Sequence, residues 1–219
     1  LPRQSVWNRR PEALDAFRNL GQALVERQVL LDVVADENLT AERLQNYPAV
    51  ILPTAVSLSD SQLAALRAYS ADGGLVLQYD EAATLDESGT PRRDSSIDGA
   101  VPVDAAPVSD ADAHAAADPI VTRLRQHGSS VIESPWTVRA TAYQQSGRIV
   151  LHLVNYDRDE SPDKQLKGPE LERPKPVKNV AVNFRLPEGE SVTSVTMLSP
   201  DDSQTHTLTF KQRDGRVSF

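Results

Sequence analysis

The sequence has 219 residues, enough for one large domain or two modest ones that each bury a core. Hydrophobic residues make up 39% and charged residues 25%, which is typical of a folded protein, and no apolar run approaches the roughly 20 residues that span a bilayer. The net charge of -8 argues against general affinity for nucleic acid or anionic membranes, and the absence of cysteine excludes disulfides, thiolate nucleophiles and zinc–thiolate sites.

The first half of the sequence alternates helical periodicity with short apolar runs. Apolar residues at helical spacing predict a helix over residues 11–28, and the run at 29–34 predicts a strand. Thr40 is the expected cap of a short helix over 41–47. The β-branched run at 49–53, closed by proline, is typical of a buried parallel strand.

The same alternation continues to residue 128. A helix capped by Ser59 or Asp60 precedes a buried strand at 75–77, a further helix is expected over 110–126, and residues 5–7 form a short candidate first strand. Helices alternating with wholly apolar strands indicate an open parallel sheet with helices on both faces. We therefore predict a flavodoxin-like or Rossmann-like α/β domain over residues 1–128.

The second half has the period-two alternation of antiparallel strands. Residues 136–143 and 148–156 flank a Ser-Gly turn and predict a hairpin, followed by a polar loop at 157–178. The later strand candidates are 180–186, 192–198, 206–210 and 217–219. Together these strands predict a small antiparallel β-sandwich over residues 129–219.

The negative charge is concentrated in one segment. Residues 80–118 hold ten acids against two arginines, whereas residues 129–219 hold twelve acids and twelve bases. Four of these acids follow the strand at 75–79, at the carboxyl end where open α/β sheets hold ligands: Asp80, Glu81, Asp86 and Glu87. They form either a hydrolytic carboxylate pair or a solvated acidic loop. The scarcity of aromatic sugar platforms nearby favours the loop.

Other chemical sites find little support. Gly73-Gly74 follows a helix and precedes a strand, the reverse of the order in phosphate-binding turns, so a helix C-cap is the better interpretation. No serine elbow is present, and the four histidines lack metal-ligand spacing. We therefore predict no catalytic residue, no metal site and no cofactor.

Three aromatic residues give a carbohydrate-binding alternative. Trp136, Tyr143 and Tyr156 lie on or beside the predicted hairpin, where they could stack on sugar rings. A core position for Trp136 is the favoured interpretation. A carbohydrate-binding module and a hydrolase using the acids after residues 75–79 thus stay open as alternatives.

Two parts of the sequence resemble a known family. The run LLDVVADENLTAERLQNYPAVILPTAVSLSDSQLAALRAYSADGGLVL resembles the middle domain of β-galactosidases of glycoside hydrolase family 42, and GRIVLHLVNYDRD with VNFRLPEGESVTSV resembles their small C-terminal β domain. The resemblance implies a class I glutamine amidotransferase-like fold without its nucleophile, a role in building a trimer, and a catalytic barrel N-terminal to this region. The catalytic glutamates of that barrel have no counterpart here.

On this resemblance we expect a non-catalytic accessory or oligomerisation region. Its expected partners are copies of itself or the barrel of a parent chain, with carbohydrate as a further candidate and neither nucleic acid nor membrane. Because the sequence begins at Leu1, we expect a fragment or a processed product.

Overall fold

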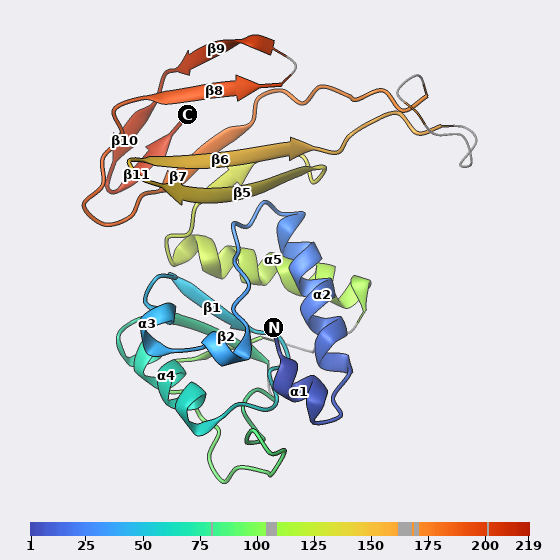
Figure 1. Ribbon diagram of the computed structural model, residues 1–219, viewed down its shortest axis with the longest axis vertical. Helices are drawn as coiled ribbons and strands as arrows, with labels where there is room; N and C mark the ends of the chain where they lie inside the picture. Colours follow the sequence, from blue (N-terminus) through green and yellow to red (C-terminus); the bar gives the residue numbers. More distant parts are fainter. Residues whose placement is uncertain (80, 104–108, 162–167, 169–170, 201) are drawn as a thin grey trace. The chain divides into compact units, whose positions relative to one another are not determined.

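The computed structural model describes residues 1–79, 81–103, 109–161, 168, 171–200 and 202–219. The chain divides into two compact units (Figure 1). The first unit comprises Leu1–Arg27 and Leu31–Gly128, and the second comprises Gln28–Leu30 and Ser129–Phe219. No helix within the described ranges has both the length and the apolar character needed to cross a membrane.

The first unit is built around a three-stranded parallel sheet in the order β1-β2-β3. Its strands are β1 (Ala49–Leu52), β2 (Leu75–Tyr79) and β3 (Val101–Val103). Leu52 of β1 pairs with Gln78, and Leu77 of β2 pairs with Val101. The prediction of an α/β unit with a parallel sheet is confirmed. The sequence did not predict β3, because a strand of three residues is too short to show a hydrophobic period.

Helices lie on both sides of this sheet. They are α1 (Arg3–Trp7), α2 (Glu12–Val25), α3 (Ala41–Leu44), α4 (Asp60–Ala71) and α5 (Asp110–Gln126), with a 3-10 turn at Asp36–Asn38. Figure 1 shows α3 and α4 on one side of the sheet and α2 and α5 on the other. The α4 side is closed by a cluster in which Leu44, Leu66 and Val76 are fully buried.

The ends of α4 follow directly from its sequence. The Ser59 hydroxyl accepts the Gln62 backbone N–H, and the Gln62 side chain accepts the Ser59 N–H, which completes a capping box. At the other end the N–H of Gly73 (φ +90) donates to the Ser70 carbonyl, and the N–H of Gly74 donates to the Tyr69 carbonyl. This is a Schellman C-cap, as expected for the glycine pair.

Two predicted strands of the first half are wrong. Residues 5–7 belong to α1, because the Ser5 hydroxyl is buried against the Ser57 N–H and Gln4 donates to Asp36. Residues 29–34 form no strand. Gln28–Leu30 pack within the second unit, whereas the side chains of Leu31 and Val33 are exposed, so the apolar run is divided between different environments.

The second unit contains a four-stranded antiparallel sheet in the order β10-β11-β7-β4. The strands are β4 (Val131–Glu133), β7 (Ala181–Arg185), β10 (Lys211–Arg213) and β11 (Arg216–Ser218). Ile132, Val182 and Val217 are buried on one face. Residues on alternate positions of the same strands therefore form the opposite face.

Two hairpins complete the second unit. β5 (Val138–Gln145) pairs with β6 (Arg148–Asn155), and β8 (Val195–Ser199) pairs with β9 (Asp202–Leu208). Ala140 and Leu151 of the first hairpin pack with Ile132 and Val182 of the four-stranded sheet. The predicted antiparallel strands are thus present, arranged as one four-stranded sheet and two separate two-stranded sheets.

Candidate functional site

The described acids of the segment after β2 form ion pairs and hydrogen bonds with neighbouring protein groups. Asp80 lies outside the described residues. Glu81 is 3.8 Å from the Arg10 guanidinium, and the Glu87 carboxylate lies 4.0 Å from that of Arg92. The Glu81 and Glu87 side chains are more than half exposed, whereas Arg10 is partly buried and Arg92 is largely buried.

Asp86 has the most specific surroundings of these acids. Its Oδ1 accepts the Ser88 hydroxyl at 2.7 Å and the backbone N–H groups of Ser88 and Thr90 at 2.9 and 2.8 Å. The Ser88 hydroxyl bond, followed by the Thr90 N–H bond, lowers the pKa of Asp86. An ionised carboxylate that accepts these hydrogen bonds stabilises the turn. A general acid would instead need a raised pKa.

Trp136 and Tyr156 lie on neighbouring chain segments at one end of the β5–β6 hairpin. The Tyr156 N–H donates to the Thr137 carbonyl at 3.0 Å, which sets the two aromatic residues on neighbouring chain segments just outside the strands. Their exposed fractions are 65% and 63%. The core position expected for Trp136 is therefore wrong. The Arg139 guanidinium lies 5.7 Å from the Trp136 ring centre, a cation–π contact.

Tyr143 lies apart from this pair. It pairs with Val150, whereas the end near Trp136 is marked by the pair Val138–Asn155. Five residues of strand separate Val138 from Tyr143, which corresponds to about 16 Å. The Tyr143 ring instead meets His152 edge-on at 5.4 Å. The hairpin thus brings together two of the three aromatic residues that the sequence singled out.

The carboxyl ends of β1 and β2 hold buried hydroxyls. Tyr79, Thr54 and Ser57 each have a buried side-chain oxygen with no hydrogen-bond partner among the described residues. Burial raises the pKa of Tyr79 to about 12, so its phenol is neutral at physiological pH. Within the same described ranges, no group of three or more His, Asp or Glu side chains is placed to hold a metal ion.

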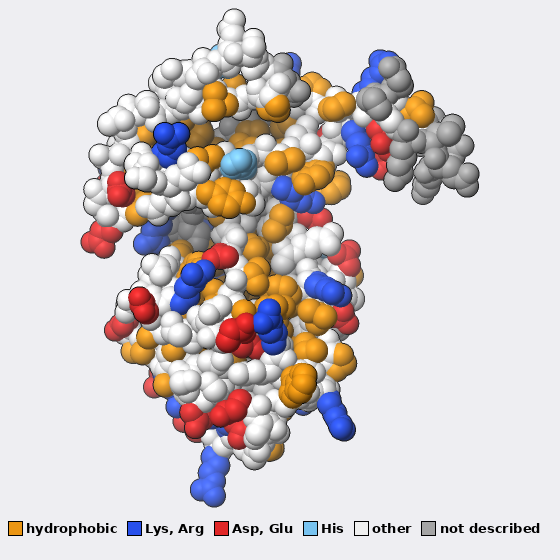
Figure 2. Space-filling view, viewed as in Figure 1, with side chains coloured by type: hydrophobic (Ala, Val, Ile, Leu, Met, Phe, Trp, Pro, Cys, Tyr) orange, Lys and Arg blue, Asp and Glu red, His pale blue; other side chains and the backbone are white. Residues whose placement is uncertain are grey.

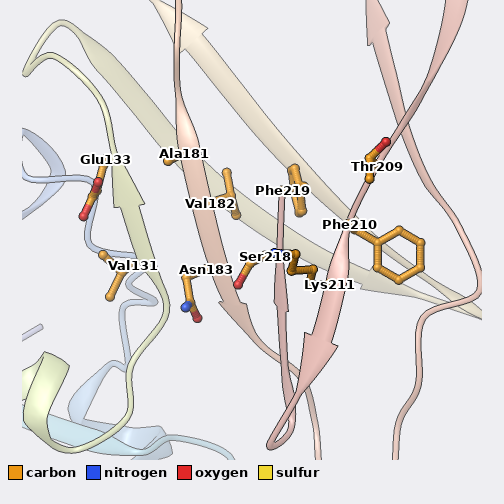
Figure 3. A pocket seen from close by; sticks show the side chains of 10 residues that line it. All are labelled: Val131, Glu133, Ala181, Val182, Asn183, Thr209, Phe210, Lys211, Ser218 and Phe219. Carbon is orange, nitrogen blue, oxygen red and sulfur yellow. The ribbon is translucent and has the colours of Figure 1, made fainter.

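An open pocket of about 420 Å³ lies over the four-stranded sheet of the second unit (Figure 3). Its polar lining includes Glu133, Asn183, Lys211 and Ser218, and Phe210 and Phe219 contribute apolar side chains. Sequence reasoning missed this surface because it depends on the register of four strands that are distant in the chain. The alternation of Lys, Arg, Asn and Ser with apolar residues was the available signal.

The chain was compared with family models, curated proteins and solved structures. No family model matches the chain, and no curated protein matches it. One solved structure was found, that of an apo exo-carrageenase GH42 from Bacteroides ovatus, with 11% identity and a TM-score of 0.43. The match covers 92% of this chain and 26% of that protein, so the chain spans about a quarter of its length.

Proposed function

We propose that this chain is a non-catalytic, self-associating accessory region of a glycoside-hydrolase-like protein, with a first unit of the amidotransferase-like kind. The observation that carries the self-association is the exposure of large apolar side chains in the second unit. The interpretation of the acids after β2 as loop-forming residues supports the absence of catalysis. We expect the purified chain to show no turnover of nitrophenyl glycosides, and measurable turnover would contradict this.

The β8–β9 hairpin is the strongest element of the proposed interface. Met197 and Leu198 are 46% and 74% exposed, and Leu198 lies where the register of β8 with β9 shifts. Thr196 and Met197, which alternate regularly before this shift, are also both exposed, so both faces of the hairpin are open. A two-stranded sheet open on both faces is marginal in water, and each of its strands is an unprotected edge. A second copy of the chain would cover these residues by strand addition or by packing on either face.

The β5–β6 hairpin offers a second apolar surface. Its register places Tyr143, His152 and Val154 on the same outer face, and all three are exposed. Figure 2 shows hydrophobic side chains gathered over this hairpin. Exposed aromatic and aliphatic side chains in one unit are characteristic of a protein interface.

Sedimentation velocity over a range of chain concentrations tests the self-association. We expect reversible association by the full chain, and we expect the double substitution Met197→Ser/Leu198→Ser to weaken it by about tenfold or more. The matched control is Leu31→Ser/Val33→Ser, which removes two similarly exposed aliphatic side chains from the first unit. A monomer at all concentrations up to about 100 µM, or equal weakening in the control, would contradict the proposal.

Carbohydrate binding at Trp136 and Tyr156 is a second candidate function. The exposure of both rings at one hairpin end favours it, because sugar rings stack on accessible aromatic faces. Affinity electrophoresis in neutral polysaccharide gels would then show retardation that Trp136→Ala removes. Trp7→Ala is the control, since Trp7 is also highly exposed but lies in the first unit. Equal mobility with and without polysaccharide would reject this function.

A further inference from the structure

One face of the four-stranded sheet collects positive charge. In its register Arg213 pairs with Arg216, and Arg216 pairs with Arg185, so three arginines form a row across β10, β11 and β7. Lys211 lies two residues from Arg213 and therefore on the same face. Val217, between Arg216 and Ser218 in β11, is buried on the opposite face.

This row is unfavourable for the isolated sheet. Like charges directly opposite each other on antiparallel strands destabilise the pair. The four strands carry a single acid, Glu133, which pairs with Ala181 and so lies away from the arginine row. Arg213 is 3.1 Å from Asp214, but both side chains are more than four-fifths exposed, so water screens the pair. Among the described residues, Arg185 and Lys211 have no ion-pair partner.

The middle arginine is fixed in place. Arg216 donates from Nη2 to the Ser129 carbonyl at 2.8 Å and to the Asn183 carbonyl at 3.2 Å, and its Nε donates to the Asn183 side chain. It is only half-exposed, whereas Arg213 and Arg185 on either side are exposed. An ordered guanidinium between two freely accessible ones is suited to binding the oxygens of sulfate or carboxylate groups.

The pocket continues this face beyond the arginines. Lys211, Ser218 and Asn183 form the next row of the sheet and line the pocket, together with Thr209 and, at its far side from the arginine row, Glu133. Figure 3 shows Lys211 and Ser218 side by side there. Hydroxyl and amide groups beside a row of cations match a ligand whose charged groups alternate with many hydroxyls.

We propose that this face binds a linear anionic polysaccharide, with its sulfate or carboxylate groups on the arginine row and its hydroxyls in the pocket. Nucleic acid fits less well. Phe184 and Phe219 pack against the core cluster, which leaves Phe210 of the pocket lining as the aromatic side chain beside this face that could stack on a base. The proposal is independent of self-association, and either one can fail alone.

Affinity electrophoresis of the full chain tests this binding in gels that contain dextran sulfate, polygalacturonate, unsulfated dextran or poly(U). We expect retardation by one or both acidic polysaccharides, with the stronger one identifying sulfate or carboxylate as the preferred group. Arg185→Gln/Arg213→Gln should weaken it by about tenfold and lower its salt dependence. The control is Arg148→Gln/Lys178→Gln, which removes two exposed charges of the same unit from outside this sheet.

Several results would overturn the proposal. They are no retardation by either acidic polysaccharide, equal retardation by unsulfated dextran, tighter binding of poly(U), or equal loss in the control variant. Should the double variant fail to fold, Lys211→Gln provides a milder test, since this exposed side chain lies beside the pocket. A change of less than twofold in Lys211→Gln would then count against the proposal.

Discussion

The two units place their apolar residues very differently. Among the described residues, twenty-six buried hydrophobic residues belong to the first unit and six to the second. The large exposed hydrophobic residues show the reverse distribution, with four in the first unit and eight in the second. The first unit therefore buries most of its apolar side chains internally, whereas the second leaves a substantial part of its own exposed to solvent.

The difference follows from architecture. The parallel sheet of the first unit is covered by helices, so strands such as β2 are buried on both faces and contain consecutive apolar residues. The hairpins of the second unit each have two strands and cannot enclose a core of their own. Burial in this second unit is limited chiefly to the contact between the β5–β6 hairpin and the four-stranded sheet.

The largest expected effect is the loss of a first-unit core residue. Leu66 is fully buried in the cluster between α4 and the sheet. Leu66→Ala should lower the free energy of unfolding by about 3 kcal/mol, through lost burial and the cavity that remains. Leu198→Ala in the second unit should change the stability of the monomer by less than about 0.5 kcal/mol. Denaturant unfolding at low protein concentration checks both, and similar losses would remove the contrast between the units.

A smaller effect is expected at the junction of α4 and β2. A methyl group at Gly74 would overlap the buried ring of Tyr69, whose hydroxyl is bonded to the Tyr47 carbonyl at 3.0 Å. Gly74→Ala should therefore cost about 2 kcal/mol. In Gly73→Ala the added methyl group would have no atom within 4 Å, so the expected cost is only the strain of a positive φ, about 1 kcal/mol. Thermal unfolding of the two variants gives the comparison, and a larger cost at Gly73 would contradict this packing.

At neutral pH the smallest expected effect concerns the buried phenol of Tyr79. Its pKa is about 12 in the folded chain against the ordinary value of 10. Between these values the unfolded chain has released the proton and the folded chain has kept it, so stability should fall as pH rises from 10 to 12. Tyr79→Phe should flatten this decline while leaving stability near pH 7 equal or slightly higher, since the hydroxyl lacks a partner. An equal loss of stability between pH 10 and 12 in the original chain and in Tyr79→Phe would show that burial of Tyr79 does not cause the decline.

Local signals in the sequence predicted the elements that depend on local physics. The Ser59 cap, the glycine pair after α4 and the long α5 helix all follow from neighbouring residues. The prediction of a strand over residues 29–34 was wrong because their apolar side chains lie in different environments, which no local pattern reveals. β3 and β4 have three residues each, too few for periodicity to mark them.

The candidate sites show the same limit. The sequence singled out Trp136, Tyr143 and Tyr156, but only the hairpin register shows that the first and last are close and Tyr143 is distant. Hydrophobicity placed Trp136 in a core, whereas its side chain is 65% exposed just outside the β5–β6 hairpin. The arginine row depends entirely on the pairing of strands, since Arg185 and Arg216 are neighbours across the sheet and thirty-one residues apart in sequence.

The central claim is that the apolar surface of the second unit becomes covered by another copy of the chain. Trp7 and Trp136 are the two tryptophans of the sequence, so the variant Trp7→Phe/Trp136→Phe/Leu198→Trp carries one fluorescent reporter, which lies in the β8–β9 hairpin. Acrylamide quenching of this tryptophan should decrease as chain concentration rises through the association range, with a blue shift of its emission. Quenching that stays constant while sedimentation shows association would place the interface elsewhere and contradict the account.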